Sequence, residues 1–264
     1  MATYLDRILE EHRMSAREDL RKLDQLVEDA RSVPESRGFV VAVQGRPQGE
    51  PAVIAEIKRR SPSKGDLIGD LDPAQVAVEY ADGGATCLSV LTDWNFFGGS
   101  AIDLKAAREV VDLPVLRKDF TVDARDVCDS RIMGADAVLL IAAALDDAEL
   151  ADFQALAFDL GIDALVEVHD EFELERALAV GANLVGVNQR DLMTFEVDTN
   201  RALRMASTMP EGVVLVAESG VRGASDARAL FEAGYDALLV GESVVVASDR
   251  SSAVRSLRQC AQMG

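Results

Sequence analysis

The sequence predicts a (β/α)8 TIM barrel with an N-terminal helical extension, and three observations support this fold class. The chain has 264 residues, of which 48% are apolar, so one domain of barrel size can bury a large core. Short runs rich in Val, Ile and Leu alternate with amphipathic segments along most of the chain. These runs are almost continuously apolar, which is typical of parallel strands that are buried on both faces.

Eight apolar runs are the expected strands of the barrel. A Gly-x-Asp or Gly-x-Asn triplet precedes four of them, and its glycine supplies the left-handed residue that ends a helix. An open doubly wound sheet is the alternative, but it needs fewer strands, and no Gly-x-Gly-x-x-Gly motif follows the first run. The runs are Ala52–Ile57, Thr86–Leu91, Pro114–Leu116, Ala137–Ala142, Ala164–Val168, Leu184–Val187, Val213–Ala217 and Ala237–Val240, and the triplets begin at Gly134, Gly161, Gly181 and Gly234.

Amphipathic helices are expected between the strands. Asp72 followed by Pro73 indicates a helix start, because aspartate caps a helix and proline fits its first position. The helices with the clearest apolar face are Asp146–Leu160, Asp170–Val180 and Ala224–Ala233.

Residues 1–50 precede the first strand. Tyr4–Arg31 is charged and helix-like, whereas Val33–Glu50 is loop-like and contains glycine and proline. We expect residues 1–50 to form an extra helix packed near one barrel end and residues 51–264 to form the barrel, within a single domain of residues 1–264.

The chain is strongly acidic, with a formal net charge of −19 from 46 acidic and 27 basic residues. Such a protein lacks the basic face of a duplex nucleic-acid binder, so no nucleic-acid partner is expected. Only 5 of the basic residues are lysines, and an acidic, lysine-poor surface is typical of proteins from halophilic archaea, whose charges are screened in multimolar salt. An ordinary acidic cytosolic enzyme is the alternative. The repulsive surface favours a monomer over a weak homodimer.

The sequence also predicts a cytoplasmic protein without a membrane partner. No apolar run reaches the roughly 18 residues that cross a bilayer, and the N-terminus has no signal-peptide core. Cys87, Cys128 and Cys260 are far apart and form no Cys-x-x-Cys motif, so neither a disulfide framework nor a zinc site is expected. His12 and His169 are likewise too far apart to suggest a pair of metal ligands.

Polar residues end most of the expected strands. In parallel barrels the active site lies at the carboxyl ends of the strands, so these residues should share one mouth. A buried lysine costs several kcal/mol unless it is paired, and we therefore expect Lys118 and Glu167 to be functional, whereas a structural ion pair remains an alternative for Glu56. The strand ends are Glu56-Ile-Lys58, Arg117-Lys118-Asp119, Glu167, Asn188-Gln-Arg190, Glu218-Ser219-Gly220 and Gly241-Glu242-Ser243.

The same mouth is expected to bind an anion. Three of the 5 lysines, Lys58, Lys64 and Lys118, map to it, which locally reverses the field of an acidic chain. A solvated loop is the alternative for the cluster of Lys58 and Lys64. Glycines follow the seventh and eighth strands, where such barrels commonly bind a phosphate. The residues thus indicate a phosphate-bearing small molecule and Lys/Glu acid–base chemistry, without naming the reaction.

At these positions the chain closely resembles the indole-3-glycerol phosphate synthase family of tryptophan biosynthesis. The resemblance runs from about residue 51 to residue 245, and its most specific part is the Glu-x-Lys…Ser-Pro-Ser block. Arg60 departs from the family, which usually has a small residue there, and this affects at most the packing of the loop. The matching segments are Ile54–Gly65, Leu91–Asp93, Phe96–Ser100, Leu116–Phe120, Leu165–His169, Val185–Leu192 and Val216–Gly220.

The resemblance implies the substrate 1-(2-carboxyphenylamino)-1-deoxyribulose 5-phosphate and ring closure with loss of CO2 and water. The ketone oxygen must gain a proton, and Lys118 is the expected acid. Glu167 is the expected base of the later dehydration. Lys58 would contact anionic groups of the substrate or act as the dehydration acid, and Glu56 would orient Lys58 or take a proton.

The resemblance assigns the other residues to binding. Asn188 and Glu218 would bind substrate hydroxyls and position the lysines, Arg190 would support the carboxylate, and Ser219 would contact the substrate. No metal, flavin or nicotinamide is expected, because the nitrogen lone pair supplies the electrons. The ring would be walled by Phe96, Phe97 and Phe120, with plain core as the alternative, and the phosphate surrounded by Ser61, Gly220, Gly241, Glu242 and Ser243.

Two other functions remain as alternatives. A related barrel, phosphoribosylanthranilate isomerase, typically uses a Cys/Asp pair on strands 1 and 6, whereas strand 1 here carries Glu56 and Lys58. A non-catalytic barrel that binds a sugar phosphate would not need both Lys118 and Glu167 to be ionisable and to face inward.

Overall fold

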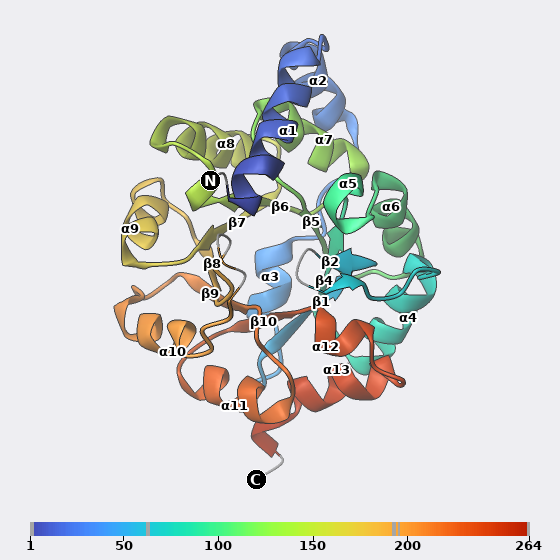
Figure 1. The fold of residues 1–264 in the computed structure, drawn as a ribbon, viewed down its shortest axis with the longest axis vertical. Helices are drawn as coiled ribbons and strands as arrows, with labels where there is room; N and C mark the ends of the chain where they lie inside the picture. Colours follow the sequence, from blue (N-terminus) through green and yellow to red (C-terminus); the bar gives the residue numbers. More distant parts are fainter. Residues whose placement is uncertain (1–2, 62–63, 192–193, 195, 263–264) are drawn as a thin grey trace.

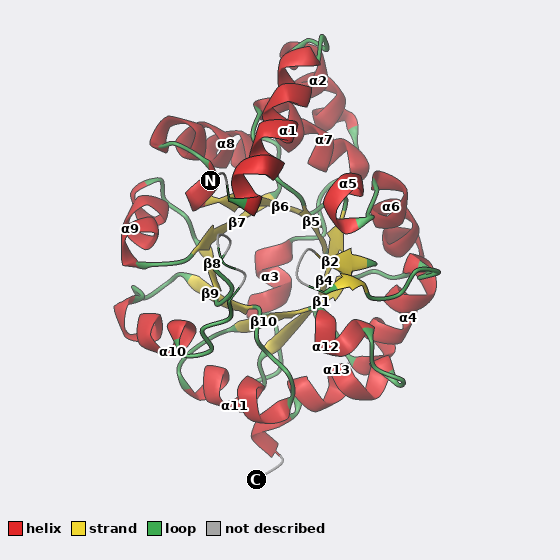
Figure 2. Ribbon diagram, in the orientation of Figure 1, coloured by secondary structure: helices red, strands yellow, loops and turns green. Residues whose placement is uncertain are grey.

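The computed structural model describes residues 3–61, 64–191, 194 and 196–262. Its eight-stranded parallel sheet closes into a barrel in which β1 pairs with both β4 and β10, and helices surround the barrel (Figures 1 and 2). This closure excludes the open doubly wound sheet. The expected strands are confirmed to within two residues as β1 (Ala52–Ile57), β4 (Cys87–Leu91), β5 (Val115–Lys118), β6 (Ala137–Ile141), β7 (Asp163–Val168), β8 (Leu184–Asn188), β9 (Val214–Glu218) and β10 (Ala237–Val240).

The helices follow the strands as the amphipathic segments predict. Asp72 caps the first of them by accepting the N–H groups of Ala74 and Gln75, with Pro73 at the first helical position. The outer helices are α4 (Pro73–Gly83), α6 (Ala101–Val110), α7 (Ala124–Met133), α8 (Asp147–Asp159), α9 (Glu171–Ala179), α10 (Arg201–Met205), α11 (Ala224–Glu232) and α13 (Arg250–Arg258). Shorter elements stand at the mouth, namely β2 (Arg60–Ser61), β3 (Gly65–Asp66), α5 (Trp94–Phe97) and α12 (Glu242–Val245).

Apolar side chains fill two regions on the two faces of the sheet. One lies between strands and helices and includes Leu88, Leu140 and Val166. The other fills the barrel interior, where Ile54 and Leu165 are fully buried. Strands that are buried on both faces explain why the apolar runs of the sequence show no alternation.

The N-terminal extension differs from the single helix that we expect from the sequence. The segment Tyr4–Arg31 divides into α1 (Tyr4–Glu18) and α2 (Leu23–Ser32), and the segment Val33–Glu50, expected to be loop-like, contains α3 (Phe39–Gln44). Phe39 and Val43 of α3 are fully buried against the interior cluster, next to the first residues of the strands. The short helix therefore closes the amino-terminal end of the barrel, and Figure 1 shows it inside the ring of strands.

Aspartates of the Gly-x-Asp triplets anchor this closing helix. Asp136 accepts the N–H of Arg37 at 2.7 Å, and Asp163 accepts the N–H of Val40 at 2.9 Å. Asp236 forms an ion pair with Arg46 at 2.6 Å. The glycines of the triplets end helices with φ between 72° and 107°, as predicted, but the aspartates have a second role that the sequence analysis missed.

Helix α1 lies at the opposite end of the barrel, beside the mouth. His12 binds Asp93, which follows β4, with 3.1 Å between Nε2 and Oδ2. Arg13 forms a bidentate ion pair with Glu149 at the start of α8. The extension thus reaches both ends of the barrel, because α2 runs along α7 between them (Figure 1). No described helix is long and apolar enough to cross a bilayer.

Candidate active site

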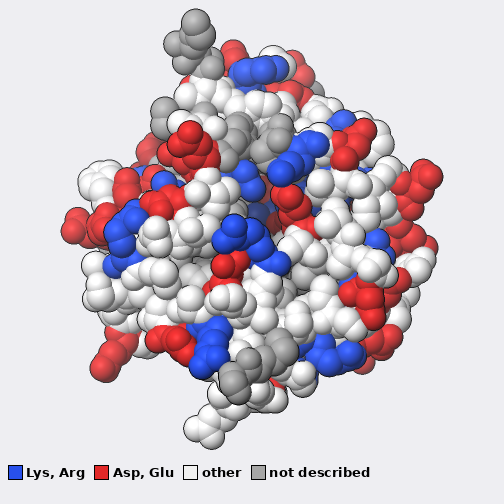
Figure 3. Space-filling model, turned by 60° about the horizontal axis from the view of Figure 1, so that its bottom comes forward, with Lys and Arg blue, Asp and Glu red and all other residues white. Residues whose placement is uncertain are grey.

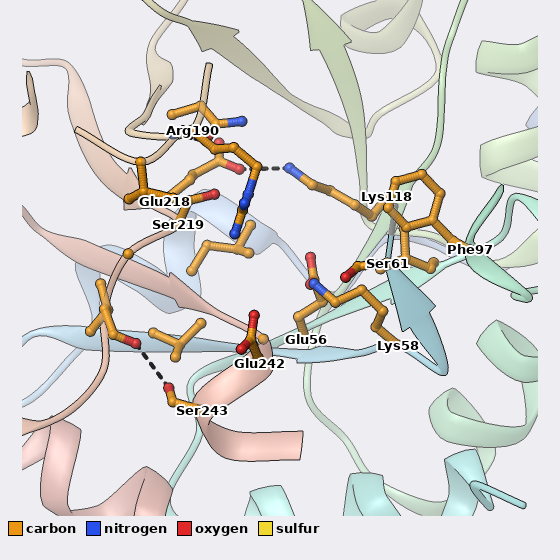
Figure 4. A pocket seen from close by; sticks show the side chains of 18 of the residues that line it. Glu56, Lys58, Ser61, Phe97, Lys118, Arg190, Glu218, Ser219, Glu242 and Ser243 are labelled. Atoms are coloured by element: carbon orange, nitrogen blue, oxygen red, sulfur yellow. Dashed lines mark hydrogen bonds and ion pairs between the residues drawn. The ribbon is translucent and has the colours of Figure 1, made fainter. Parts of the chain in front are cut away.

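A cavity of about 510 Å³ opens at the carboxyl ends of the strands. Figure 3 shows basic atoms in and around a central hollow on this side of the molecule, although the chain as a whole is acidic. The site residues predicted from the sequence line this cavity, except Phe96 (Figure 4). They are Glu56, Lys58, Ser61, Phe97, Lys118, Phe120, Glu167, Asn188, Arg190, Glu218, Ser219, Gly220, Gly241, Glu242 and Ser243, together with Lys64.

Phe96 does not line this cavity, in contrast to Phe97 and Phe120, which were predicted with it as ring walls. Its ring makes an edge contact with Tyr4 of α1, with 5.7 Å between the ring centroids. Phe96 and Phe97 are consecutive residues of a one-turn helix, so their side chains diverge by about 100°. Phe97 therefore turns to the cavity, where its ring lies 6.1 Å from that of Phe120, and Phe96 holds the N-terminal extension instead.

Lys118 forms the centre of the site. Its Nζ donates to Glu167 Oε2 at 2.9 Å and to Glu218 Oε2 at 2.6 Å. Both carboxylates are almost fully buried. The first, third, fifth and seventh strands of the barrel carry Glu56, Lys118, Glu167 and Glu218, respectively. Alternate strands of such a barrel contribute one layer of inward side chains. The uppermost layer thus holds one ammonium group and three carboxylates.

Burial and charge push the pKa values of this layer apart. Burial alone would lower the pKa of Lys118, but the three surrounding carboxylates outweigh it and raise the pKa above its ordinary range. Burial would likewise raise the pKa of Glu167, yet Lys118, His169 and the amide of Asn188 lower it. For Glu218, burial and the neighbouring carboxylates prevail over Lys118 and raise the pKa. The site therefore holds a protonated lysine, an ionised Glu167 and a Glu218 that retains a proton more readily.

Asn188 serves one of these carboxylates. Its Nδ2 donates to Glu167 Oε1 at 2.9 Å. The amide therefore contacts the glutamate, whereas the resemblance implied that it would position the lysines. Arg201 on α10 in turn donates to the carbonyl of Asn188 at 2.9 Å. Glu218, in contrast, accepts a hydrogen bond from Lys118.

Two glycines make room for the carboxylates. A Cβ atom on Gly186 of β8 would overlap Glu218 Oε1, and one on Gly241 would overlap Glu56 Oε1. A glycine inside a strand is a signal of a close approach, and this signal could have identified Gly186, which the sequence analysis missed. Gly241 was predicted for phosphate binding, and the structure places it against the carboxylate of Glu56 as well.

A second Lys/Glu pair stands beside the first. Lys58 Nζ lies 2.5 Å from Glu56 Oε1, as expected for residues two apart on one strand face. The nearby Arg60, which departs from the family pattern, donates to the backbone carbonyls of Trp94 and Asn95. It therefore joins the loop after β1 to α5 at the rim of the mouth. Pro62, Ser63 and Leu192 of the matching segments lie outside the described residues.

The loops after β9 and β10 form the other side of the cavity. Ser219 and Gly220 both have left-handed backbones, with φ of 64° and 75°, which is uncommon for a serine and typical of strained functional turns. Gln189, which the sequence analysis did not single out, fixes this turn by donating to the carbonyl of Ser219 at 2.7 Å. The hydroxyl of Ser243 donates to the carbonyl of Val221 at 2.9 Å, so Ser243 can donate to an anion only through its backbone N–H.

Among the described residues, His12, Asp93 and Asp119 lie near enough to one another to hold a metal ion. Their side-chain atoms already form hydrogen bonds within the protein, however. Asp93 accepts from His12 and from two backbone N–H groups of α5, and Asp119 accepts from Thr92, Arg117 and its neighbouring backbone. Arg117 also brings a positive charge next to Asp119. The group fits a network that docks α1 on the mouth better than it fits a metal centre.

One family model matches nearly the whole chain. The family model described as indole-3-glycerol phosphate synthase matches residues 5–257, which includes most of the N-terminal extension.

Several solved structures share the fold at low identity. The thiamine phosphate pyrophosphorylase from Pyrococcus furiosus has a TM-score of 0.60 and 17% identity, over 81% of this chain and 97% of that one. A 3-hexulose-6-phosphate synthase has a TM-score of 0.63 and 17% identity, over 79% of this chain and 99% of that one. The N-acetylmannosamine-6-phosphate 2-epimerase from Clostridium perfringens has a TM-score of 0.58 and 13% identity, over 73% and 86%. These similarities establish the TIM barrel.

Proposed function

The chain belongs to the indole-3-glycerol phosphate synthase family, and from this premise we propose how the residues at its barrel mouth divide the reaction. The family converts 1-(2-carboxyphenylamino)-1-deoxyribulose 5-phosphate into indole-3-glycerol phosphate, CO2 and water, in tryptophan biosynthesis. The observation that supports the assignment of roles most strongly is the buried Lys118 between Glu167 and Glu218.

Ring closure needs a proton at the ketone. The aromatic carbon that carries the carboxylate attacks the ketone carbon, a carbon–carbon bond forms, and the carbonyl electron pair moves to oxygen. Lys118 donates a proton to that oxygen. Its raised pKa keeps the proton on the amine until the far more basic alkoxide develops, so the acid is charged when it is needed.

Decarboxylation then restores the aromatic ring. The carbon–carboxylate bond breaks and CO2 leaves. The bond electrons return to the ring and neutralise the positive charge that the anilino nitrogen and the ring acquired during ring closure. No external electron acceptor is required for this step. The cavity needs only to hold the carboxylate-bearing ring in place, and Phe97 and Phe120, which line it, are suited to that task.

Dehydration completes the product. The hydroxyl formed during ring closure leaves as water after it gains a proton, and the nitrogen lone pair assists its departure. A base then removes a proton from the neighbouring ring carbon. Glu167 is suited to this step because its lowered pKa keeps it ionised, and Lys58, held by Glu56 at 2.5 Å, is the candidate acid on the other side of the mouth.

The anionic groups of the substrate require cations or N–H donors. We assign the carboxylate to Arg190 and Lys58, and the phosphate to Ser61, Gly220 and the backbone of the loop after β10, where Gly241, Glu242 and Ser243 line the cavity. We assign Ser219 to a further contact with the substrate. The left-handed turn at Ser219 and Gly220 supports this assignment, because it lets backbone N–H groups approach an oxyanion closely.

We also propose that the chain works as a single-domain monomer in a cytoplasm of high salt. Three cysteines that are buried and unpaired support a reducing compartment, and the net charge of −19 supports both a halophilic origin and mutual repulsion of copies.

A fluorescence assay for the formation of indole-3-glycerol phosphate from the named substrate tests the assignment of the base. We expect Glu167→Gln to lower kcat by about 100-fold or more. Glu175→Gln on exposed α9 is the matched control and should retain wild-type activity. If Glu167→Gln turns over substrate at the wild-type rate, the role of Glu167 is overturned. If the folded wild-type chain shows no turnover, the proposed function is overturned.

A further inference from the structure

His169 stands directly behind the proposed base, and the mechanism above does not use it. It follows β7, two residues after Glu167, so both side chains leave the same face of the strand. Its Nε2 lies 3.6 Å from Glu167 Oε1. The side chain is only 12% exposed, and Nε2 is buried and accepts or donates no hydrogen bond within the described part of the chain. A buried imidazole nitrogen that faces a carboxylate without a hydrogen bond calls for an explanation.

The other ring nitrogen shows which way the ring is fixed. Nδ1 lies 3.0 Å from Glu173 Oε2, on the first turn of α9, and the same oxygen accepts the backbone N–H of His169 at 2.8 Å. A carboxylate can only accept, so Nδ1 carries a proton and Nε2 is the position that gains or loses the second one. The ring is thereby locked with its titrating nitrogen toward Glu167.

We propose that His169 is a positioning residue for the reaction, which holds Glu167 in its ionised, base-competent form through an imidazolium directed at Oε1. The inference rests on the role proposed for Glu167. Glu173 would act one step further out, by orienting the ring and favouring its positive charge. The chain Glu173–His169–Glu167 thus extends the site from the barrel axis to α9.

The charges around His169 support a cation at this place. Burial would lower the pKa of His169, but the hydrogen bond to Glu173 and the charges of Glu167 and Glu173 outweigh it and raise the pKa. The positive charge of Arg201, on α10, opposes this effect and lowers the pKa of His169. Glu167 in turn has its pKa lowered by His169, in addition to Lys118, so the two groups stabilise each other's charged forms.

The first test is the pH profile of kcat/KM. His169→Asn keeps a polar group near Glu173 but removes the positive charge. We expect the acidic limb to move up by roughly one pH unit, as a lost opposite charge within about 4–6 Å implies. Glu173→Gln should move it in the same direction by less, and Glu175→Gln, on the exposed face of α9, should leave it in place. A reduced kcat with an unshifted profile in His169→Asn would overturn the inference.

The second test does not depend on turnover, so it separates this inference from the proposed function. The chain has only two histidines, and NMR of ¹⁵N-labelled imidazoles, assigned with His12→Gln, reports the pKa of His169 directly. The inference predicts that Glu167→Gln and Glu173→Gln each lower that pKa, whereas Glu175→Gln does not. If the pKa of His169 is unchanged in Glu167→Gln, the inference is overturned, even where the wild type is active as proposed. These variants retain His169, so the test stands if His169→Asn fails to fold.

Discussion

The alanine variant of Gly186 tests whether the geometry of the carboxylate layer controls activity. Gly186 lies inside β8 and has no left-handed backbone, so alanine fits its backbone without strain. The added Cβ would overlap Glu218 Oε1 and come within 3.2 Å of Leu165 Cδ1. Because Leu165 is fully buried, the carboxylate of Glu218 must move. We expect this displacement of Oε1 to break the 2.6 Å hydrogen bond that Oε2 of the same carboxylate accepts from Lys118.

The size of the effect follows from that bond. A hydrogen bond to a charged group contributes about 1.5–3 kcal/mol, and a tenfold change in rate corresponds to about 1.4 kcal/mol. We therefore expect Gly186→Ala to lower kcat/KM by about 10- to 100-fold. Overpacking should also reduce the free energy of unfolding by about 1–3 kcal/mol.

Fluorescence assays and urea unfolding of the wild type and four variants test this reasoning. Glu218→Ala removes the group with which the new methyl collides, so adding Gly186→Ala to it should cost little more activity and should restore stability lost in Gly186→Ala alone. Gly69→Ala is the control, because its Cβ would meet no atom within 4 Å. The reasoning is refuted if Gly186→Ala stays within twofold of the wild type, or if the two effects add in full.

Three further predictions concern stability. First, burial and the neighbouring carboxylates raise the pKa of Glu218, so the folded state binds this proton more tightly than the unfolded state. The unfolding free energy should therefore fall as the pH rises above 4.5 toward neutrality, and it should fall less steeply in Glu218→Gln. Equal slopes in the two proteins would contradict this prediction. Second, Phe39→Ala should lower the free energy of unfolding by about 3–5 kcal/mol, whereas Val41→Ala, at a residue that is 71% exposed, should change it little. Similar losses for both variants in urea unfolding would argue against the closing role of α3. Third, multimolar KCl should raise the thermal midpoint, because it screens a net charge of −19; a midpoint that falls with KCl would contradict the halophilic interpretation.

The strands were predictable because parallel strands of a barrel are buried on both faces, and such burial leaves a continuous apolar run in the sequence. The end of β5 was missed by two residues, since Arg117 and Lys118 are polar although they belong to the strand. Helix α3 was missed for a different reason. It has only six residues, too few for a helical period to show, and its burial depends on the barrel beneath it.

The positions of the charged site residues were also predictable, since the carboxyl ends of parallel strands meet at one mouth. The partners of those residues were not. Gly186 acts through its contact with Glu218 on the neighbouring strand, and the glycine within a strand run signals a close approach without naming that partner. His169 lies two residues after Glu167, a spacing that places both on one strand face but that the sequence analysis did not use. The sequence analysis did not distinguish Phe96 from Phe97, because it did not predict the one-turn helix in which adjacent side chains point in different directions.

The most direct test of the account is the formation of indole-3-glycerol phosphate by the wild type and by Lys118→Met, in dilute buffer and in about 2–3 M KCl, where charges are fully screened. Methionine matches the length of the lysine stem but cannot donate a proton. The account predicts turnover by the wild type and a loss of at least about 100-fold in the variant at either salt concentration. Comparable turnover by a folded Lys118→Met would contradict the central role of the buried lysine.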